Sequence, residues 1–102
     1  MKKWYEVHNY AQGDEYITEG SDINNTDNIW TTKIPWDFKP ADDYEPPKPH
    51  RFSTKVEATR IKDQIKAVRL DEWNRNSHIY KIYGDKKPSW KVYSFSEQTR
   101  EQ

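Results

Sequence analysis

The sequence predicts a small α+β domain, with one helix packed on an antiparallel sheet of about four to five strands in the order β-β-β-α-β-β. Two observations lead to this class. Short β-branched and aromatic segments lie on both sides of one segment with helical apolar spacing. Apolar residues make up only 32% of the 102 residues, but aromatic residues make up 15%. Because each aromatic side chain buries a large area, a modest core is expected.

The first third of the chain is expected to contain three strands. Their segments are rich in aromatic and β-branched residues and are separated by turn residues such as Gly13 and Gly20. In the first segment, Tyr5 and Val7 share one face and Trp4 lies on the other. The expected strands cover about residues 3–10, 15–19 and 29–34.

A long connection follows at residues 35–50, and we call it the proline arm. It contains five of the six prolines, which excludes a helix or a central strand there. Irregular connections of this length are uncommon in compact domains and are usually functional or mobile. Two interpretations stay open. Either the arm drapes over the domain and fills gaps in the core, or it presents an aromatic surface to a partner, with Trp36, Phe38 and Tyr44 as the residues concerned.

A helix is predicted over about residues 54–73. Thr54 and Glu57 have the spacing of a capping box, and Asn74 or Asn76 can end the helix. An apolar stripe at helical spacing predicts the core-facing side, formed by Ala58, Ile61, Ile65 and Val68. A basic row lies about 100° round the helix, formed by Lys55, Lys62, Lys66 and Arg69.

The C-terminal segment, residues 78–95, predicts a β-hairpin. The segments "HIYKIY" and "WKVYSF" read as strands, with "GDKKPS" as the connecting turn. One face would pack on the helix, and the other would present the side chains of Lys81, Tyr83, Lys91, Tyr93 and Phe95. Residues 96–102 are polar and predict a loose tail.

The residues favour neither catalysis nor cofactor binding. The chain has no cysteine, and His8, His50 and His78 lack the partners and spacing of metal motifs. Its three glycines form no phosphate-binding pattern, and no nucleophile elbow is present. We therefore expect no enzyme activity, no metal and no cofactor.

The expected location is the cytoplasm, or the host cytoplasm if a phage encodes the chain. No apolar segment approaches the roughly 20 residues that span a bilayer, and no apolar region follows the basic start. Ile, Asn and Lys are frequent while leucine occurs once, at Leu70, a bias associated with AT-rich genomes such as those of phages and mobile elements.

The leading functional prediction is a non-enzymatic protein-binding module, plausible as a phage or mobile-element inhibitor or adaptor of a host or defence protein. Trp, Tyr and Arg commonly anchor interfaces, and the chain is rich in aromatic residues. Residues 1–50 have ten acidic and five basic residues, a net charge of −5, so an acidic surface that mimics nucleic acid is a possible form of this function. The predicted protein-binding residues are Trp36, Phe38, Asp42, Asp43, Tyr44 and Glu45.

The alternative is a protein that binds single-stranded nucleic acid. Residues 51–102 have seven acidic and twelve basic residues, a net charge of +5, and aromatic residues beside lysines can stack bases. The net charge of zero for the whole chain opposes this alternative, because positive charge dominates phosphate binding. The two halves of opposite charge can also simply attract each other within one fold. The residues of the alternative are Lys55, Lys62, Lys66, Arg69, Lys81, Tyr83, Lys91 and Tyr93.

Overall fold

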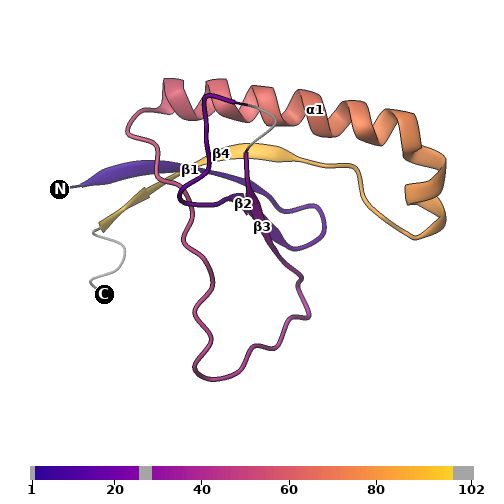
Figure 1. Ribbon diagram of the computed structural model, residues 1–102, viewed down its shortest axis with the longest axis horizontal. Coiled ribbons are helices and arrows are strands. Elements are labelled where there is room, and N and C mark those ends of the chain that lie inside the picture. The colour runs from indigo at the N-terminus through magenta and orange to yellow at the C-terminus, as the bar shows by residue number, and fades with distance from the viewer. Residues whose placement is uncertain (1, 26–28, 98–102) are drawn as a thin grey trace.

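The computed structural model describes residues 2–25 and 29–97, and it confirms the predicted α+β class. One helix covers one face of a four-stranded antiparallel sheet whose strand order is β3-β2-β1-β4 (Figure 1). The elements are β1 (Lys3–Asn9), β2 (Asp14–Ile17), β3 (Thr31–Ile34), α1 (Lys55–Ile82) and β4 (Trp90–Ser96). The predicted loose tail lies mostly outside the described residues, at positions 98–102.

Strand β1 lies between β2 and β4 and contributes side chains to both faces of the sheet. It pairs with β4 from Lys3↔Ser96 to Asn9↔Trp90, and with β2 only at its C-terminal end, at His8↔Tyr16 and Asn9↔Glu15. Successive side chains of a strand point to opposite faces. Val7 therefore faces α1, while Trp4, Glu6 and His8 point to the face that α1 does not cover.

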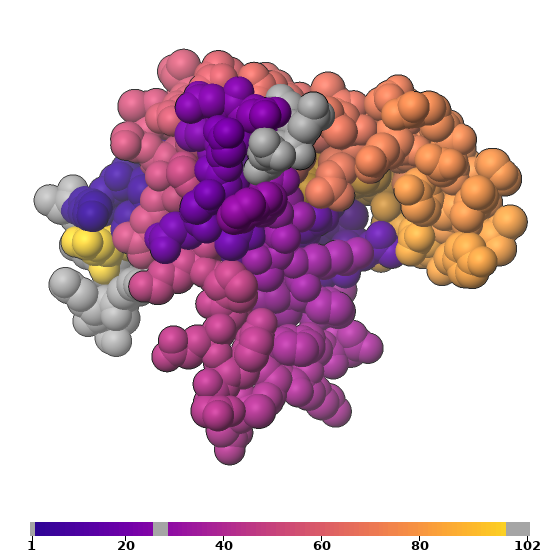
Figure 2. Space-filling view, viewed as in Figure 1, coloured from indigo at the N-terminus to yellow at the C-terminus, as the bar shows by residue number. Residues whose placement is uncertain are grey.

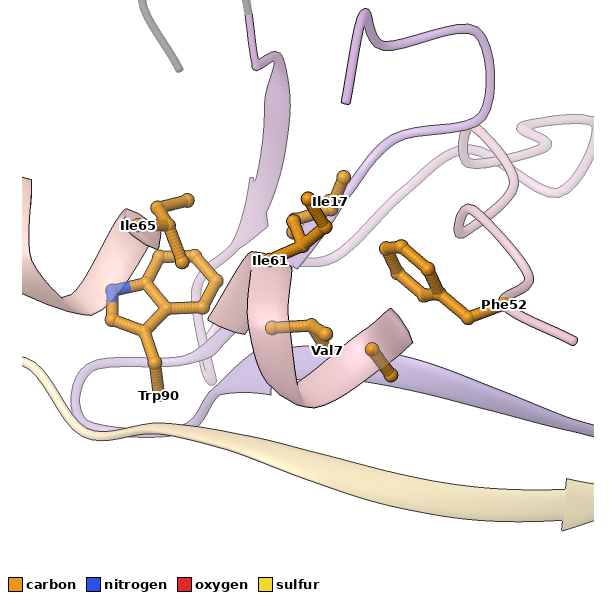
Figure 3. Close-up of a cluster of buried hydrophobic side chains, with 7 residues drawn as sticks. Val7, Ile17, Phe52, Ile61, Ile65 and Trp90 are labelled. Carbon is orange, nitrogen blue, oxygen red and sulfur yellow. The ribbon is translucent and has the colours of Figure 1, made fainter. Parts of the chain in front are cut away.

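The core lies between α1 and the sheet (Figure 3). Phe52 enters it just before the helix, because its backbone pairs with Tyr5: the Tyr5 N–H donates to the Phe52 carbonyl at 2.9 Å, and the Phe52 N–H donates to the Tyr5 carbonyl at 2.8 Å. The buried side chains come from every layer of the fold and are Val7, Ile17, Phe52, Ala58, Ile61, Ile65 and Trp90.

The helix begins as predicted, but its apolar stripe turns away from the expected line. Thr54 is the N-cap, and its hydroxyl accepts a hydrogen bond from the Glu57 N–H at 3.2 Å. Ala58, Ile61 and Ile65 are buried, whereas Val68 is 42% exposed. Arg69, four residues after Ile65, points to the sheet instead and reaches Glu15 at 3.5 Å. The side of the helix that faces the sheet therefore runs through Ile61, Ile65 and Arg69, at intervals of four residues. The prediction that Val68 faces the core was wrong.

The predicted C-terminal hairpin was also wrong, because residues 78–82 belong to α1. Asn76 has non-helical dihedral angles (φ −122°, ψ 16°) and its side-chain amide donates to the Glu72 carbonyl, so it bends the helix without ending it. Trp73 and Tyr80, two turns apart, stack across this bend with ring centroids 5.3 Å apart. The element order is therefore β-β-β-α-β, and β4 pairs with β1 rather than with a neighbour in sequence.

Gly84, predicted within a hairpin turn, instead follows the end of the helix. Its φ of +76° is the left-handed conformation that commonly closes a helix. The N–H groups of Gly84 and Asp85 donate to the carbonyls of Lys81 and Tyr80, at 3.1 and 2.9 Å. Within the described residues, α1 lacks the run of apolar side chains that a membrane-crossing helix requires, and it is the one helix present.

Truncating one core residue and one residue near the end of α1 shows whether residues 78–82 continue the helix or form the predicted strand. Ile61→Ala should lower the free energy of unfolding by about 2–5 kcal/mol, because Ile61 is fully buried. Ile82→Ala should change it by less than about 0.5 kcal/mol, because Ile82 is 77% exposed on the helix. Urea denaturation followed by circular dichroism measures both changes. Similar losses for the two variants would favour a packed strand at residues 78–83.

Candidate functional site

The proline arm projects from the body of the protein, below the sheet in the views of Figures 1 and 2. Its aromatic side chains do not fill the core: Trp36 is 68% exposed, Phe38 42% and Tyr44 41%. The draping interpretation was therefore wrong for these three residues. The described core is formed instead by residues of the sheet and the helix, together with Phe52, which follows the arm.

The predicted protein-binding residues lie together on this arm, and ring contacts hold its three aromatic side chains in place. Trp36 stacks on Tyr10 of the body, with ring centroids 6.0 Å apart and an interplanar angle of 12°. Phe38 and Tyr44 form an edge-to-face pair at 5.4 Å across the arm. The carboxylates of Asp42, Asp43 and Glu45 are exposed beside this pair. The two aspartates precede Tyr44 in the sequence, and the glutamate follows it.

The returning end of the arm is fastened to the β2 side of the sheet. The Glu19 N–H donates to the Lys48 carbonyl at 2.8 Å, and the His50 N–H donates to the Ile17 carbonyl at 2.7 Å. The Tyr16 hydroxyl donates to the Pro47 carbonyl. The "PPKP" segment, which has the spacing of a polyproline ligand, is thus held by its own domain. The aromatic part of the arm is left to face solvent.

An ionic cluster of two buried side chains and one half-buried side chain lies on the sheet face opposite α1. His8 is 4% exposed and uses both ring nitrogens: Nε2 lies 2.8 Å from Glu6 Oε1, and Nδ1 lies 2.6 Å from Asp14 Oδ1. Glu6 also accepts a hydrogen bond from the Trp4 indole N–H at 2.7 Å. We call Glu6, His8 and Asp14 the ionic cluster.

Hydrogen bonding determines the charges in the ionic cluster. Burial by itself lowers the pKa of His8, but its bonds to Glu6 and Asp14 outweigh burial and raise the pKa above the ordinary value. Burial by itself raises the pKa of Glu6, but the bonds from His8 and Trp4 outweigh it and lower the pKa. An imidazolium between two carboxylates is therefore favoured. Because both nitrogens are engaged, His8 is poorly placed to act as a general base.

Aromatic rings surround His8 and connect it to the arm. Tyr10 stacks on His8 with ring centroids 5.3 Å apart. Trp36 of the arm in turn stacks on Tyr10. Tyr16, Tyr93 and Phe95 also lie within 6.0 Å of the imidazole by ring centroid. Burial, and then the nearby Asp14 carboxylate, raise the pKa of Tyr10 to about 12. The ionic cluster and these rings thus support the base of the arm.

The ionic cluster was not predicted, because Glu6, His8 and Asp14 form no recognised motif in the sequence. The available signal was the alternation of Trp4, Glu6 and His8 along one strand face, followed by Asp14 just after the turn. Alternate residues share a face, and a tight turn returns the chain beside them. Across residues 2–25 and 29–97, no group of three or more His, Cys, Asp or Glu residues has the arrangement of a metal site.

The eight residues of the nucleic-acid alternative are not brought onto one surface. Lys62 is bonded to Asp63 at 2.6 Å, and Arg69 reaches Glu15. Lys81 and Tyr83 lie at the end of α1, which covers one face of the sheet. Tyr93 pairs with Glu6 in the β1–β4 register and therefore lies on the other face, where Lys91 also lies opposite His8. The hairpin surface that would have joined these residues does not exist.

The best-defined candidate site is therefore the proline arm, with the ionic cluster behind it. Comparisons with protein-family models, with curated proteins and with solved structures each found no match for this chain. The functional proposal accordingly depends on the geometry of the arm and of its support.

The ionic cluster should give the stability a distinct pH dependence. The raised pKa of His8 stabilises the fold fully below about pH 6.5, and this stabilisation is lost as pH rises through the pKa of the folded state. The lowered pKa of Glu6 stabilises the fold above about pH 4.5, and this is lost as pH falls through its folded-state value. The cluster should therefore contribute most between about pH 4.5 and 6.5.

Urea denaturation at a series of pH values, compared with His8→Gln, measures this contribution. The difference in the free energy of unfolding between wild type and His8→Gln should shrink as pH rises above 6.5. His78→Gln is the matched control, because it makes the same substitution at a histidine that is exposed on α1, outside the ionic cluster. A pH-independent difference for His8→Gln would contradict a charged His8.

Proposed function

We propose that this protein is a small non-enzymatic module that binds another protein through the proline arm and thereby blocks or adapts it. The observation that supports this most strongly is the exposure of Trp36, Phe38 and Tyr44 on one projecting segment. Aromatic side chains bury the largest areas on binding and dominate the energetics of interfaces. Keeping three of them in water is unfavourable for a free domain, so their clustering favours an interface.

The attachment of the arm supports the same proposal. Hydrogen bonds from Glu19 and Tyr16 hold its returning end, and the stack of Trp36 on Tyr10 holds its outgoing end. A loop that is ordered before binding loses less conformational entropy when it docks. The prolines act in the same direction, since each fixes one backbone dihedral angle.

The charge of the arm indicates the kind of partner surface. Residues 35–50 contain two lysines and four acidic residues, of which Asp42, Asp43 and Glu45 lie close to the aromatic pair. A partner with apolar pockets rimmed by basic groups would complement this surface and associate faster through electrostatic steering. In the narrower form of the proposal, the partner is a host or defence protein with a basic surface, and the chain is its phage-encoded, nucleic-acid-mimicking inhibitor.

The arm proposal is tested by removing its aromatic side chains. Each of Trp36→Ala and Phe38→Ala should weaken partner binding by about 2 kcal/mol, or roughly 30-fold, if these side chains are interface anchors. The free energy of unfolding should change by less than about 1.5 kcal/mol, the upper value for an aromatic pair. A partner captured by cross-linking is purified, and its affinity for each variant is measured by calorimetry.

Trp30→Ala is the matched control for these variants. Trp30 is 62% exposed but lies before β3, outside the arm, so this change removes the same kind of side chain without affecting the proposed interface. If Trp30→Ala weakens binding as much as Trp36→Ala does, the interface is not the arm. A large loss of stability in Trp36→Ala would indicate a structural role instead.

The nucleic-acid alternative has one supporting observation, the exposure of Lys55 and Lys66 on α1. Because the remaining residues of that proposal are separated, we expect no saturable binding of labelled single-stranded oligonucleotides at physiological salt. Fluorescence anisotropy measures this, with the double variant Lys62→Glu/Lys66→Glu for comparison. Binding that weakens steeply with salt and disappears in the double variant would establish the alternative.

A further inference from the structure

A pocket of about 190 Å³ lies between the second half of α1 and the end of the sheet where β4 begins. Arg69, Trp73 and Tyr80 line it from the helix, Trp90 lines it from β4, and Glu15 and Lys33 line it from β2 and β3. Liquid water occupies roughly 30 Å³ per molecule, so the volume suits a group of about six heavy atoms or a little more.

The side chain of Trp90, which lines this pocket, carries a buried polar atom without a partner among the described residues. Trp90 is 2% exposed, and its Nε1–H has no hydrogen-bond acceptor among the residues that the structure describes. Buried donors without a partner are uncommon and costly, so each calls for an explanation. In Figure 3 the nitrogen lies on the edge of the ring away from Val7 and Phe52, on the side toward which the helix continues.

Two side chains that line the pocket, Glu15 and Asn9, already accept hydrogen bonds within the domain. The Glu15 carboxylate accepts from the Asn9 amide at 3.2 Å and from the Thr31 hydroxyl at 2.8 Å, and it faces Arg69. The Asn9 side-chain oxygen accepts from the Ser89 N–H at 2.9 Å and from the Ala11 N–H at 3.2 Å. A ligand bound in the pocket can supply the acceptor that Trp90 Nε1 lacks among the described residues.

The charges of the lining favour a neutral ligand. Three basic and three acidic side chains line the pocket, so it has no net charge with which to attract an ion. They are Lys33, Arg69, Lys86, Glu15, Glu72 and Asp85. The guanidinium of Arg69, whose Cζ lies 6.0 Å from the centre of the Trp90 ring, already faces Glu15 and is not free to pair fully with an anion.

The aromatic surfaces and the polar groups of the lining restrict the chemical class of the ligand further. Trp73, Tyr80 and Trp90 provide flat aromatic surfaces, which suit a planar group. A carboxamide is planar, and it has a carbonyl oxygen that can accept from Trp90 and an NH₂ group that can donate to a carboxylate. Glu72, which is exposed and lines the pocket, has a carboxylate that can accept that second bond.

We propose that this pocket binds a small neutral carboxamide, with its carbonyl oxygen on Trp90 Nε1 and its NH₂ group toward Glu72. The carboxamide can belong to a free small molecule or to an Asn or Gln side chain of a binding partner. The inference does not depend on the proline arm, so a failure of either proposal leaves the other standing.

Nuclear magnetic resonance of the five tryptophan indole N–H groups provides the test. The Trp90 signal is assigned by its loss in Trp90→Phe. Nicotinamide and N-acetyl-glutamine methylamide, which represent the two sources, are titrated separately to high millimolar concentration, with benzoate as the charged comparison. We expect at least one amide to shift the Trp90 signal saturably while the Trp36 signal stays in place.

The response to each probe decides the outcome. A shift with nicotinamide alone supports a free small molecule, a shift with the glutamine derivative alone supports a partner side chain, and a shift with both supports the shared chemistry. Absence of a saturable shift with either amide would overturn the proposal and leave water as the acceptor. A stronger response to benzoate than to the amides would also overturn it.

Two variants add an independent check. When binding is followed by the indole signal of Trp73, which also lines the pocket, Trp90→Phe should weaken amide binding by about 3- to 10-fold, the effect of one neutral hydrogen bond. Because Trp90 is a core residue, Glu72→Ala serves as the second variant and should weaken binding several-fold, since Glu72 is exposed and its loss should not affect folding. Asp71→Ala is its matched control, because Asp71 pairs with Arg75 outside the pocket. Equal affinities for wild type and Glu72→Ala would contradict the assigned orientation.

Discussion

The backbone pairing between Tyr5 and Phe52 is the interaction on which the rest of the structure depends. Two reciprocal hydrogen bonds return the chain to β1 after the long excursion of the proline arm. This return places Phe52 in the core and positions Thr54 to cap the helix directly afterwards. It also helps to close the arm into a loop, because the adjoining residues 48–50 bond to Ile17 at the end of β2 and to Glu19 just after it, while Trp36 stacks on Tyr10 at the outgoing end.

Strand β1 then separates two different kinds of interior. On the helix side, Val7 contributes to an apolar core, where burial of hydrocarbon provides the stabilisation. On the other side, none of the residues that the structure describes forms a covering helix, and His8 with its two carboxylates lies beneath a layer of aromatic rings. Ionic and aromatic contacts there replace the aliphatic residues that the composition lacks, and one ring of that layer, Tyr10, supports Trp36 of the arm.

The two proposed binding features differ in physical character. The arm offers exposed aromatic side chains and net negative charge, as expected of a surface that anchors a protein. The pocket at Trp90 offers a buried donor and balanced charges, as expected of a site for a small polar group. Both are supported by contacts that already exist in the isolated domain, which reduces the entropic cost of binding.

Local signals in the sequence determined the class of fold, the three N-terminal strands, the capped start of the helix and the irregular arm. Each depends on residues close together along the chain: alternation, capping at Thr54, and the local backbone restriction imposed by proline. Only the tertiary structure decided whether residues 78–82 continue the helix, because "HIYKIY" fits either state and the Trp73–Tyr80 stack favours the helix. Only the tertiary structure likewise decided the exposure of Trp36 and the burial of His8. Trp36 contacts Tyr10, which is distant in sequence, and His8 contacts Asp14 across a turn.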